Sequence, residues 1–368
     1  MRREGWEDIK KRYEAWWHAD LYDRPLLHVT APRDGAPPLV PWKGGTASAE
    51  EKWSDIRYAL WLTEQALERT WYGGESLPAV QSYVSPIGMS AGGALLFGCT
   101  PRFTEDTVWV DPLPAERGFP SLAVDAVRRR WIRDSFAEAG RSSRGRFYVR
   151  ESFSNNAGDT LAAVRGTEQL MIDLVENPGW AAKAVASITE SFQGLVGELL
   201  PLVAPDVTGM EGWLSSAGMW SAGVNFCADC DVSCMISPQQ FEEIFLPPLR
   251  AAMHGYEHSL YHLDGGEAVR HLDALLASPE VDAIQWVPGA GREAILQWVP
   301  LVRRIQGAGK SVQVIARPEE VAPLLGAVSP KGLLITTSCA TETEGRDLVR
   351  LVERSWRRAW QTRSSTPS

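Results

Sequence analysis

The chain has 368 residues, of which 23% are charged and 44% are hydrophobic, and its formal net charge is -9. This is the composition of an ordinary globular protein. An acidic chain lacks the basic face on which nucleic-acid binding depends, and the sequence contains no run of about 18 apolar residues that would predict a transmembrane helix. The charged N-terminus predicts no signal peptide, and five cysteines make a disulfide framework unexpected, so we expect a cytoplasmic protein.

The sequence begins with a predicted helix over residues 1–22, which we expect to lie outside the main fold. After it, short β-rich runs alternate with longer amphipathic stretches, a pattern typical of a mostly parallel sheet. The spacing of about 25–50 residues in the second half is that of βα units in a (β/α)8 barrel. The expected strands are 26–30, 77–81, 147–150, 207–212, 259–263, 283–287, 312–316 and 333–337, and the expected later helices are 266–277, 292–306, 319–327 and 344–357.

A long, poorly periodic stretch follows the second expected strand. Residues 85–128 hold Gly, Pro and Trp, and a loop of that length within a compact domain is usually functional. Residues 363–368 are rich in Ser, Thr and Pro, and we expect a disordered tail there. We therefore predict an α/β protein: a single (β/α)8 TIM barrel over residues 23–362, with an N-terminal helical extension over residues 1–22 and a long insertion after the second strand.

Polar residues of the types that bind metals follow two of the expected strands. His262 and Asp264 stand at the end of the run 259–263, two positions apart, so that on an extended segment they point to the same side. Polar groups at the end of a buried strand cost free energy unless they are used, and that end of a barrel strand is where chemistry is done. Cys339 follows the last expected strand. We expect His262, Asp264 and Cys339 to converge as a metal site.

Each of these three residues also has an ordinary structural interpretation. His262 could be a core histidine that is hydrogen-bonded to a backbone carbonyl. Asp264 could cap the helix that is expected to begin near Gly266, a common position for aspartate. Cys339 could be an inert thiol, since free cysteine is among the most buried residue types.

Two further acids are candidate catalytic residues. Glu211 lies at the end of the fourth expected strand and could be a further ligand or a base that supports the site. Asp231 lies on a loop before Ser237-Pro238, which is a clear helix start. The alternative for Asp231 is a solvated loop aspartate. Its neighbours form a Cys227-x-x-Cys230 pair, but the chain offers no second pair for a structural zinc.

Aromatic and basic residues near the expected strand ends predict a substrate pocket. Four aromatic side chains would form a broad apolar wall, or would simply fill the barrel: Tyr83, Trp213, Trp220 and Trp286. Two cations, Arg33 after the first strand and Arg317 after the seventh, could bind a carboxylate or phosphate of the substrate. Arg317 could instead form an ion pair with Glu319 or Glu320.

Seven short stretches together resemble the uroporphyrinogen decarboxylase superfamily, in particular its divergent bacterial members. The resemblance extends from about Tyr22 to Trp360 and implies a (β/α)8 barrel. That superfamily contains cofactor-free decarboxylases of porphyrinogen acetate groups and zinc-dependent methyltransferases that act between a corrinoid carrier and a thiol. The stretches are Arg24–Leu27, Leu96–Cys99, Glu105–Trp109, Arg165–Glu168, Met235–Pro238 with Phe241, Tyr261–Gly265 and Asp282–Gly289.

The chain departs from the decarboxylases of that superfamily at three places. Their arginine-rich segment after the first strand corresponds to His28–Arg33, where Arg33 is the remaining cation. Their aspartate after the second strand falls near Gln81–Ser85, which contains no acid, and their late histidine is replaced by Cys339 or its neighbours. The resemblance therefore argues against uroporphyrinogen itself as the substrate.

The methyltransferases of the superfamily bind zinc through a His-x-Cys motif and a late cysteine. The matching positions here are His262, Asp264 and Cys339, and carboxylate is an accepted zinc ligand. We therefore predict zinc-dependent methyl transfer between a small methylated substrate or thiol and a corrinoid protein, a separate partner because the chain has no room for a cobalamin-binding domain. The alternatives are a cofactor-free decarboxylase that uses Arg33 and Asp231, and a non-catalytic ligand-binding barrel. The family resemblance also suggests a homodimer.

Overall fold

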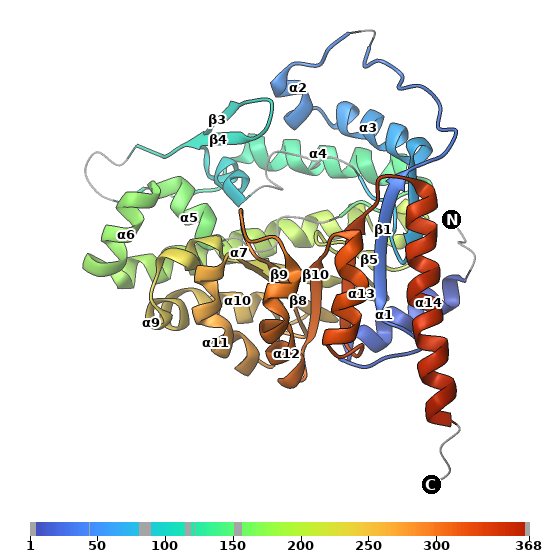
Figure 1. The fold of residues 1–368 in the computed structure, drawn as a ribbon. Helices are drawn as coiled ribbons and strands as arrows, with labels where there is room; N and C mark the ends of the chain where they lie inside the picture. The colour runs from blue at the N-terminus through green and yellow to red at the C-terminus, as the bar shows by residue number, and fades with distance from the viewer. Residues whose placement is uncertain are drawn as a thin grey trace. The chain divides into compact units, whose positions relative to one another are not determined.

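The chain folds into two compact units, and Figure 1 labels many of their elements. Unit 1 comprises Leu39–Ala66 and Ala79–Val281, and unit 2 comprises Arg2–Pro38, Leu67–Pro78 and Asp282–Ser368. The computed structural model describes residues 5–43, 45–80, 90–114, 119–120, 122–150 and 157–364. Among these residues, no helix combines the length and the apolar character needed to cross a membrane.

Unit 2 is built on five strands in the order β2-β1-β11-β10-β9. Four of them are parallel, and β2 runs antiparallel to β1. The parallel strands are almost entirely buried, which explains why they read as continuous apolar runs in the sequence. The bounds are α1 Trp6–Trp17, β1 Leu26–Pro32, β2 Thr70–Gly74, β9 Ala283–Val287, η7 Ile295–Trp298, α12 Val299–Gly307, β10 Ser311–Ile315, α13 Pro318–Ala327, β11 Leu333–Ser338 and α14 Glu342–Ser364.

The helix α1 is an integral part of unit 2. Its buried face carries Tyr13 and Trp16. The Tyr13 hydroxyl lies 2.7 Å from His28 Nε2 on β1, and the Ser311 hydroxyl at the start of β10 donates to the backbone carbonyl of Trp16. The predicted N-terminal helix therefore exists over Trp6–Trp17, and it packs on the strands of unit 2.

Unit 1 is mainly helical, and α7 is its central element. Helices α4, α5, α6 and α10 all pack on α7, which buries nine side chains. The strands of unit 1 form the parallel pair β7–β8 and two antiparallel hairpins, β3–β4 and β5–β6. The bounds up to α7 are α2 Ala49–Ser54, α3 Ile56–Arg69, which runs on into unit 2, η2 Ser90–Phe97, β3 Thr100–Phe103, β4 Val108–Asp111, α4 Ala126–Ser143, α5 Ala157–Arg165, α6 Thr167–Glu176 and α7 Pro178–Leu199.

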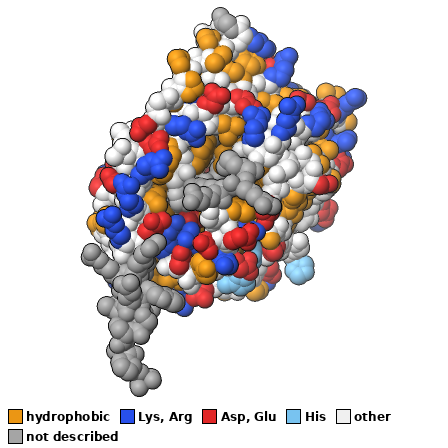
Figure 2. Space-filling model, turned by 90° about the vertical axis from the view of Figure 1, so that its right-hand side faces the viewer, with side chains coloured by type: hydrophobic (Ala, Val, Ile, Leu, Met, Phe, Trp, Pro, Cys, Tyr) orange, Lys and Arg blue, Asp and Glu red, His pale blue; other side chains and the backbone are white. Residues whose placement is uncertain are grey.

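The second half of unit 1 contains mostly short elements. They are η3 Leu200–Leu202, α8 Pro205–Thr208, β5 Trp213–Leu214, β6 Trp220–Ser221, β7 Asn225–Asp229, η4 Asp231–Met235, α9 Pro238–Gln240, η5 Phe241–Phe245, α10 Leu246–Met253, β8 His258–Asp264, η6 Gly266–His271 and α11 Leu272–Ala277. On the face shown in Figure 2, basic, acidic and hydrophobic side chains are interspersed.

The prediction of a mixed α/β fold with mostly parallel strands is confirmed. Five expected strands coincide with β1, β8, β9, β10 and β11 to within a residue or two at each end. The expected strands 77–81 and 147–150 meet in a single parallel bridge, in which Ala79 pairs with Tyr148. The insertion after the second expected strand contains η2 and the β3–β4 hairpin.

The expected strand over residues 207–212 is wrong. Pro205 stands in the first turn of the short helix α8, which ends at Gly209, and both Gly209 and Gly212 adopt positive φ. Left-handed backbone at two glycines does not fit an extended strand. The strand next to β8 is instead β7, Asn225–Asp229, which the sequence pattern did not reveal.

Candidate functional site

The candidate site lies where β7 and β8 end. The two strands are parallel and in register, with Asp229 opposite His262, so their carboxyl ends meet at the same edge. Beyond β7 the chain turns at once into η4, whose first residue is Asp231. Beyond β8, Gly265 adopts a φ of 83°, a left-handed conformation that lets the chain leave the strand sharply after Asp264.

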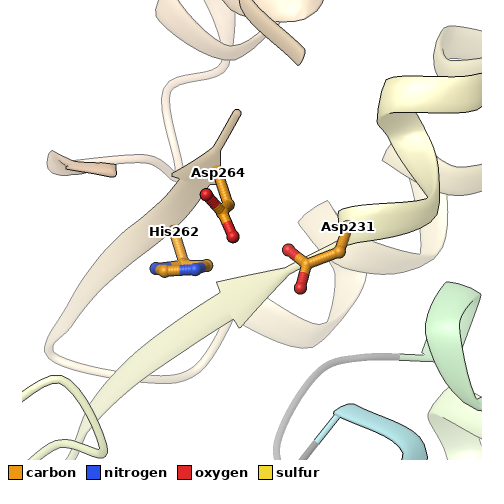
Figure 3. A group of neighbouring side chains, drawn as sticks. All are labelled: Asp231, His262 and Asp264. Atoms are coloured by element: carbon orange, nitrogen blue, oxygen red, sulfur yellow. The ribbon is translucent and has the colours of Figure 1, made fainter. Parts of the chain in front are cut away.

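Three side chains converge at this edge. The metal-binding atoms of Asp231, His262 and Asp264 all lie within 4.8 Å of one another. Figure 3 shows the side chains turned toward one another, two from β8 and one from the turn after β7. Each of the three is half-buried. The prediction that His262 and Asp264 face the same side is confirmed, and Asp231 joins them.

The structure also decides the alternative interpretation of Asp264. The residue at the N-cap of η6 is Gly265, which has no side chain that could cap the helix. Asp264 is therefore not the helix cap that the sequence allowed, and its carboxylate is turned toward the site instead (Figure 3).

The carboxylate of Asp231 lacks the partners that a buried charge requires. Burial raises its pKa above the usual range, the neighbouring His262 opposes this rise, and the charge of Asp264 adds to it. Its buried Oδ1 atom has no hydrogen-bond partner among the described residues. A cation held between the two carboxylates would supply the missing compensation. One imidazole and two carboxylates are donors that zinc accepts, and three protein ligands with an open position are typical of catalytic zinc sites.

Two aspartates that the sequence reasoning missed stand behind this site. Asp159, in the first turn of α5, accepts hydrogen bonds from the backbone amides of Asp231 and Val232 at 2.9 and 2.7 Å. Asp229 ends β7, and for its buried Oδ1 no hydrogen-bond partner is found in the part of the chain that the structure describes. Burial, reinforced by the charge of Asp231, raises the pKa of both carboxyls well above the usual range. The sequence signal for Asp229 is its spacing, because Asp229 and Asp231 flank the single residue Cys230.

Cys339, the third expected ligand, belongs to unit 2. It follows β11, and its amide donates to the carbonyl of Thr30 at 2.8 Å. Its thiol is buried, and burial, together with the charge of Glu344, raises its pKa to about 11. The thiolate form that zinc requires is therefore disfavoured unless a cation compensates it. The role of Cys339 as a ligand stays a prediction.

Glu211 stands in a turn rather than at the end of a strand. Its backbone carbonyl accepts hydrogen bonds from the Trp220 indole and the Tyr148 hydroxyl, each at 2.7 Å. Trp220 is buried on β6, whereas Trp213 on β5 is half-buried. The hydrogen bond from Trp220 connects β6 to the Glu211 turn. The catalytic role of Glu211 stays a prediction, and so do the roles of Trp213 and Trp220 in the pocket wall.

The remaining predicted substrate-binding residues lie in unit 2 or outside the described chain. Trp286 is fully buried on β9 and contacts the Trp298 ring at 4.7 Å. Arg33 is exposed and donates to the carbonyl of Thr70 at 3.1 Å. Tyr83 lies outside the residues that the structure describes.

Arg317 forms the ion pairs that the sequence offered as its alternative role. Its Nε atom lies 3.2 Å from Glu320 and 3.5 Å from Glu319, at the start of α13. The side chain remains 61% exposed, so these contacts leave room for a ligand, and substrate binding by Arg317 stays a prediction.

Comparison with known proteins adds no relative. No protein-family model matches the chain, and no curated protein matches it.

Proposed function

We propose that the protein is a zinc-dependent methyltransferase that moves a methyl group between a small methylated substrate or thiol and a separate corrinoid protein. The observation that supports a metal centre is the convergence of Asp231, His262 and Asp264 within 4.8 Å. The reaction class comes from the resemblance to the uroporphyrinogen decarboxylase superfamily, whose methyltransferases carry ligands at the positions of His262 and Asp264.

The three converging residues would hold the metal through one imidazole nitrogen and two carboxylate oxygens. Bound zinc would supply a coordinated thiolate from a thiol substrate at neutral pH. Asp231 and Asp264 bring two carboxylates to the site, and their charges favour the binding of a divalent cation. An anionic substrate would be repelled unless that cation is bound. We also propose Cys339 as a further ligand.

A closed (β/α)8 barrel is the architecture that we propose for the whole chain. The last strand, β11, pairs in parallel with the first strand, β1, which is the pairing that closes such a barrel. The parallel bridge between Ala79 and Tyr148 supports two further barrel strands. We place the protein in the cytoplasm, and its corrinoid partner and a homodimer remain part of the proposal.

A cofactor-free decarboxylase is the second candidate. Burial raises the pKa of Asp231, and a carboxyl group that keeps its proton can protonate the carbanion left after CO2 departs. This reaction would need a cation such as Arg33 for the substrate carboxylate, and it needs no metal. A non-catalytic ligand-binding barrel is the third candidate and would show neither activity.

The metal content of purified, tag-free protein separates these candidates. We expect about one zinc per chain by mass spectrometry, with the zinc lost in His262→Ala and Asp264→Ala. His254→Ala is the matched control, because His254 is an exposed histidine of the same unit. Retention of zinc in Cys339→Ser would remove Cys339 from the ligand set. A wild-type protein without metal after zinc loading would contradict the methyltransferase and favour the decarboxylase.

A further inference from the structure

The turn that carries Asp231 is held by residues from two other elements. On one side, the Asp159 carboxylate of α5 accepts the amides of Asp231 and Val232. On the other side, His271 at the end of η6 lies with its Nε2 atom 2.8 Å from the carbonyl oxygen of Ser233. Since η6 follows β8 directly, His271 connects the Asp231 turn to the segment that begins just after Asp264.

Close packing keeps α5 against the same turn. A Cβ atom at Gly158 would lie 2.8 Å from the Cys230 sulfur and 3.1 Å from the Phe245 ring. A side chain there would push α5 away from the turn, so glycine at this position lets Asp159 approach the Asp231 amide. The contact between α5 and the Asp231 turn therefore depends on two neighbouring residues of α5, Gly158 and Asp159.

Both oxygens of Asp159 are already used. Oδ2 receives the amide of Asp231 and Oδ1 receives the amide of Val232. A carboxylate that accepts two successive amides fixes the start of a helical turn as an N-cap residue does, although here it comes from another helix. If Asp159 is removed, two partly buried amides lose their acceptor, and the turn can move to find others. Such a movement would displace the Asp231 carboxylate.

We propose that Asp159 is a positioning residue, which holds the Asp231 turn where the Asp231 carboxylate meets His262 and Asp264 and so sets the affinity for a divalent cation. This inference rests on the proposed function, because it takes the three converging residues to be metal ligands. Groups that orient a metal ligand commonly change metal affinity about 10- to 100-fold when they are removed.

The test measures metal affinity on the full chain, with Co2+ and Zn2+ as probes. Cobalt binding is followed by its visible absorption, and zinc affinity by competition with a coloured chelator. In Asp159→Asn we expect affinity for both ions to fall about 10- to 100-fold and the spectrum of bound cobalt to change. Hydrogen exchange at the Asp231 and Val232 amides should become faster in the metal-free variant, a readout that needs no metal.

Two control variants separate position from other effects. Asp229→Asn also replaces a buried carboxyl group near Asp231, but Asp229 Oδ1 has no hydrogen-bond partner within the described residues. Asp125→Asn weakens a matched contact, since Asp125 accepts the amides of Val127 and Arg128 at the start of α4. We expect neither control to change the cobalt spectrum, and Asp125→Asn to leave affinity unchanged.

The outcomes distinguish this inference from the proposed function. Unchanged affinity and spectrum in Asp159→Asn would overturn the positioning role. An equal loss in Asp229→Asn would also overturn it, because the effect would then come from the loss of any buried carboxyl group near Asp231. If the wild-type protein binds neither ion, the metal site itself is absent and both proposals fall. Should Asp159→Asn not fold, Asp159→Glu shifts the carboxylate by one methylene and should weaken binding in the same direction.

Discussion

Glu75 of unit 2 and Asp231 of unit 1 are carboxylates whose charges are compensated to opposite degrees. In unit 2, Glu75 is fully buried and accepts hydrogen bonds from Arg24, Arg12 and the amide of Leu27. Burial alone would raise the pKa of Glu75, but the charges and hydrogen bonds of the two arginines hold it below the usual range. In unit 1, burial raises the pKa of Asp231, and one of its oxygens lacks a hydrogen-bond partner among the described residues.

The difference teaches what each carboxylate is for. Glu75 is compensated within the protein, so it ties α1, β1 and the end of β2 together and has nothing left to offer a ligand. Asp231 lies in a group of acids whose mutual repulsion the described protein relieves only in part. Ionisable groups with uncompensated charge cluster at functional sites. The unit 1 site is therefore expected to be unstable without its ligand, and the Glu75 cluster to be stable on its own.

The largest expected effect is the loss of the Glu75 carboxylate. Glu75→Gln should lower the free energy of unfolding by about 3–5 kcal/mol, because it leaves the buried Arg24 without its counter-charge. Urea unfolding at neutral pH measures this change. The control is Glu64→Gln, which breaks a partly exposed ion pair with Arg146 and should cost less than about 1 kcal/mol. Equal, small losses of unfolding free energy in both variants would contradict the structural role of Glu75.

The next largest effect concerns Asp231, whose replacement is expected to change metal binding rather than the stability of the metal-free protein. Asp231→Asn should leave the metal-free protein as stable as the wild type, or more stable, because it removes a repelling charge. The variant should lose the stabilisation that zinc gives the wild type, which is about 2.7 kcal/mol when free zinc is 100 times the Kd. Thermal unfolding with zinc and with a chelator measures both quantities. A metal-free variant destabilised as strongly as Glu75→Gln would show that Asp231 is a structural residue.

The same comparison explains how far the sequence could predict the molecule. Strands β8 to β11 were predicted because each is a short apolar run between turn residues, a local property. His262 and Asp264 were predicted as partners because alternation along one strand is also local. The Asp231 donor could be named as a candidate acid, but its place beside them depended on β7, which was not recognised. The sequence pattern instead predicts a strand over residues 207–212, where the chain forms the end of α8 and a turn with two glycines at positive φ.

Non-local contacts account for what the sequence did not show. Asp159 and the amide of Asp231 are 72 positions apart, and an acid in the first turn of a helix is ordinary in any sequence. Its importance comes from packing, through the glycine at position 158 that allows α5 to approach the turn. The Glu75 cluster is similar, since Arg12 and Glu75 are 63 positions apart. Compensation of a buried charge is visible only after the chain has folded.

The smallest expected effect concerns His271, a buried side chain that needs no counter-charge in its neutral form. His271 is buried, packs 4.5 Å from the Phe241 ring and bonds to the Ser233 carbonyl. Burial lowers its pKa below the usual value near 6.5, the bond to Ser233 opposes this, and the charges of Arg270 and Glu242 act in opposite directions. Because the unfolded chain binds the proton more readily, stability should fall as pH decreases through 6.5 toward the lower pKa of the folded protein.

His271→Gln should reduce that pH dependence while keeping a donor for the Ser233 carbonyl. The comparison is the change in free energy of unfolding between pH 7.5 and pH 5, measured by urea titration in the presence of a chelator. Each unit by which a pKa is lowered is worth about 1.4 kcal/mol, so the variant should lose less stability over this range than the wild type. His254→Gln replaces an exposed histidine and should behave as the wild type does. An identical pH response in His271→Gln would mean that other groups cause the acid sensitivity, and that His271 holds the Asp231 turn without sensing pH.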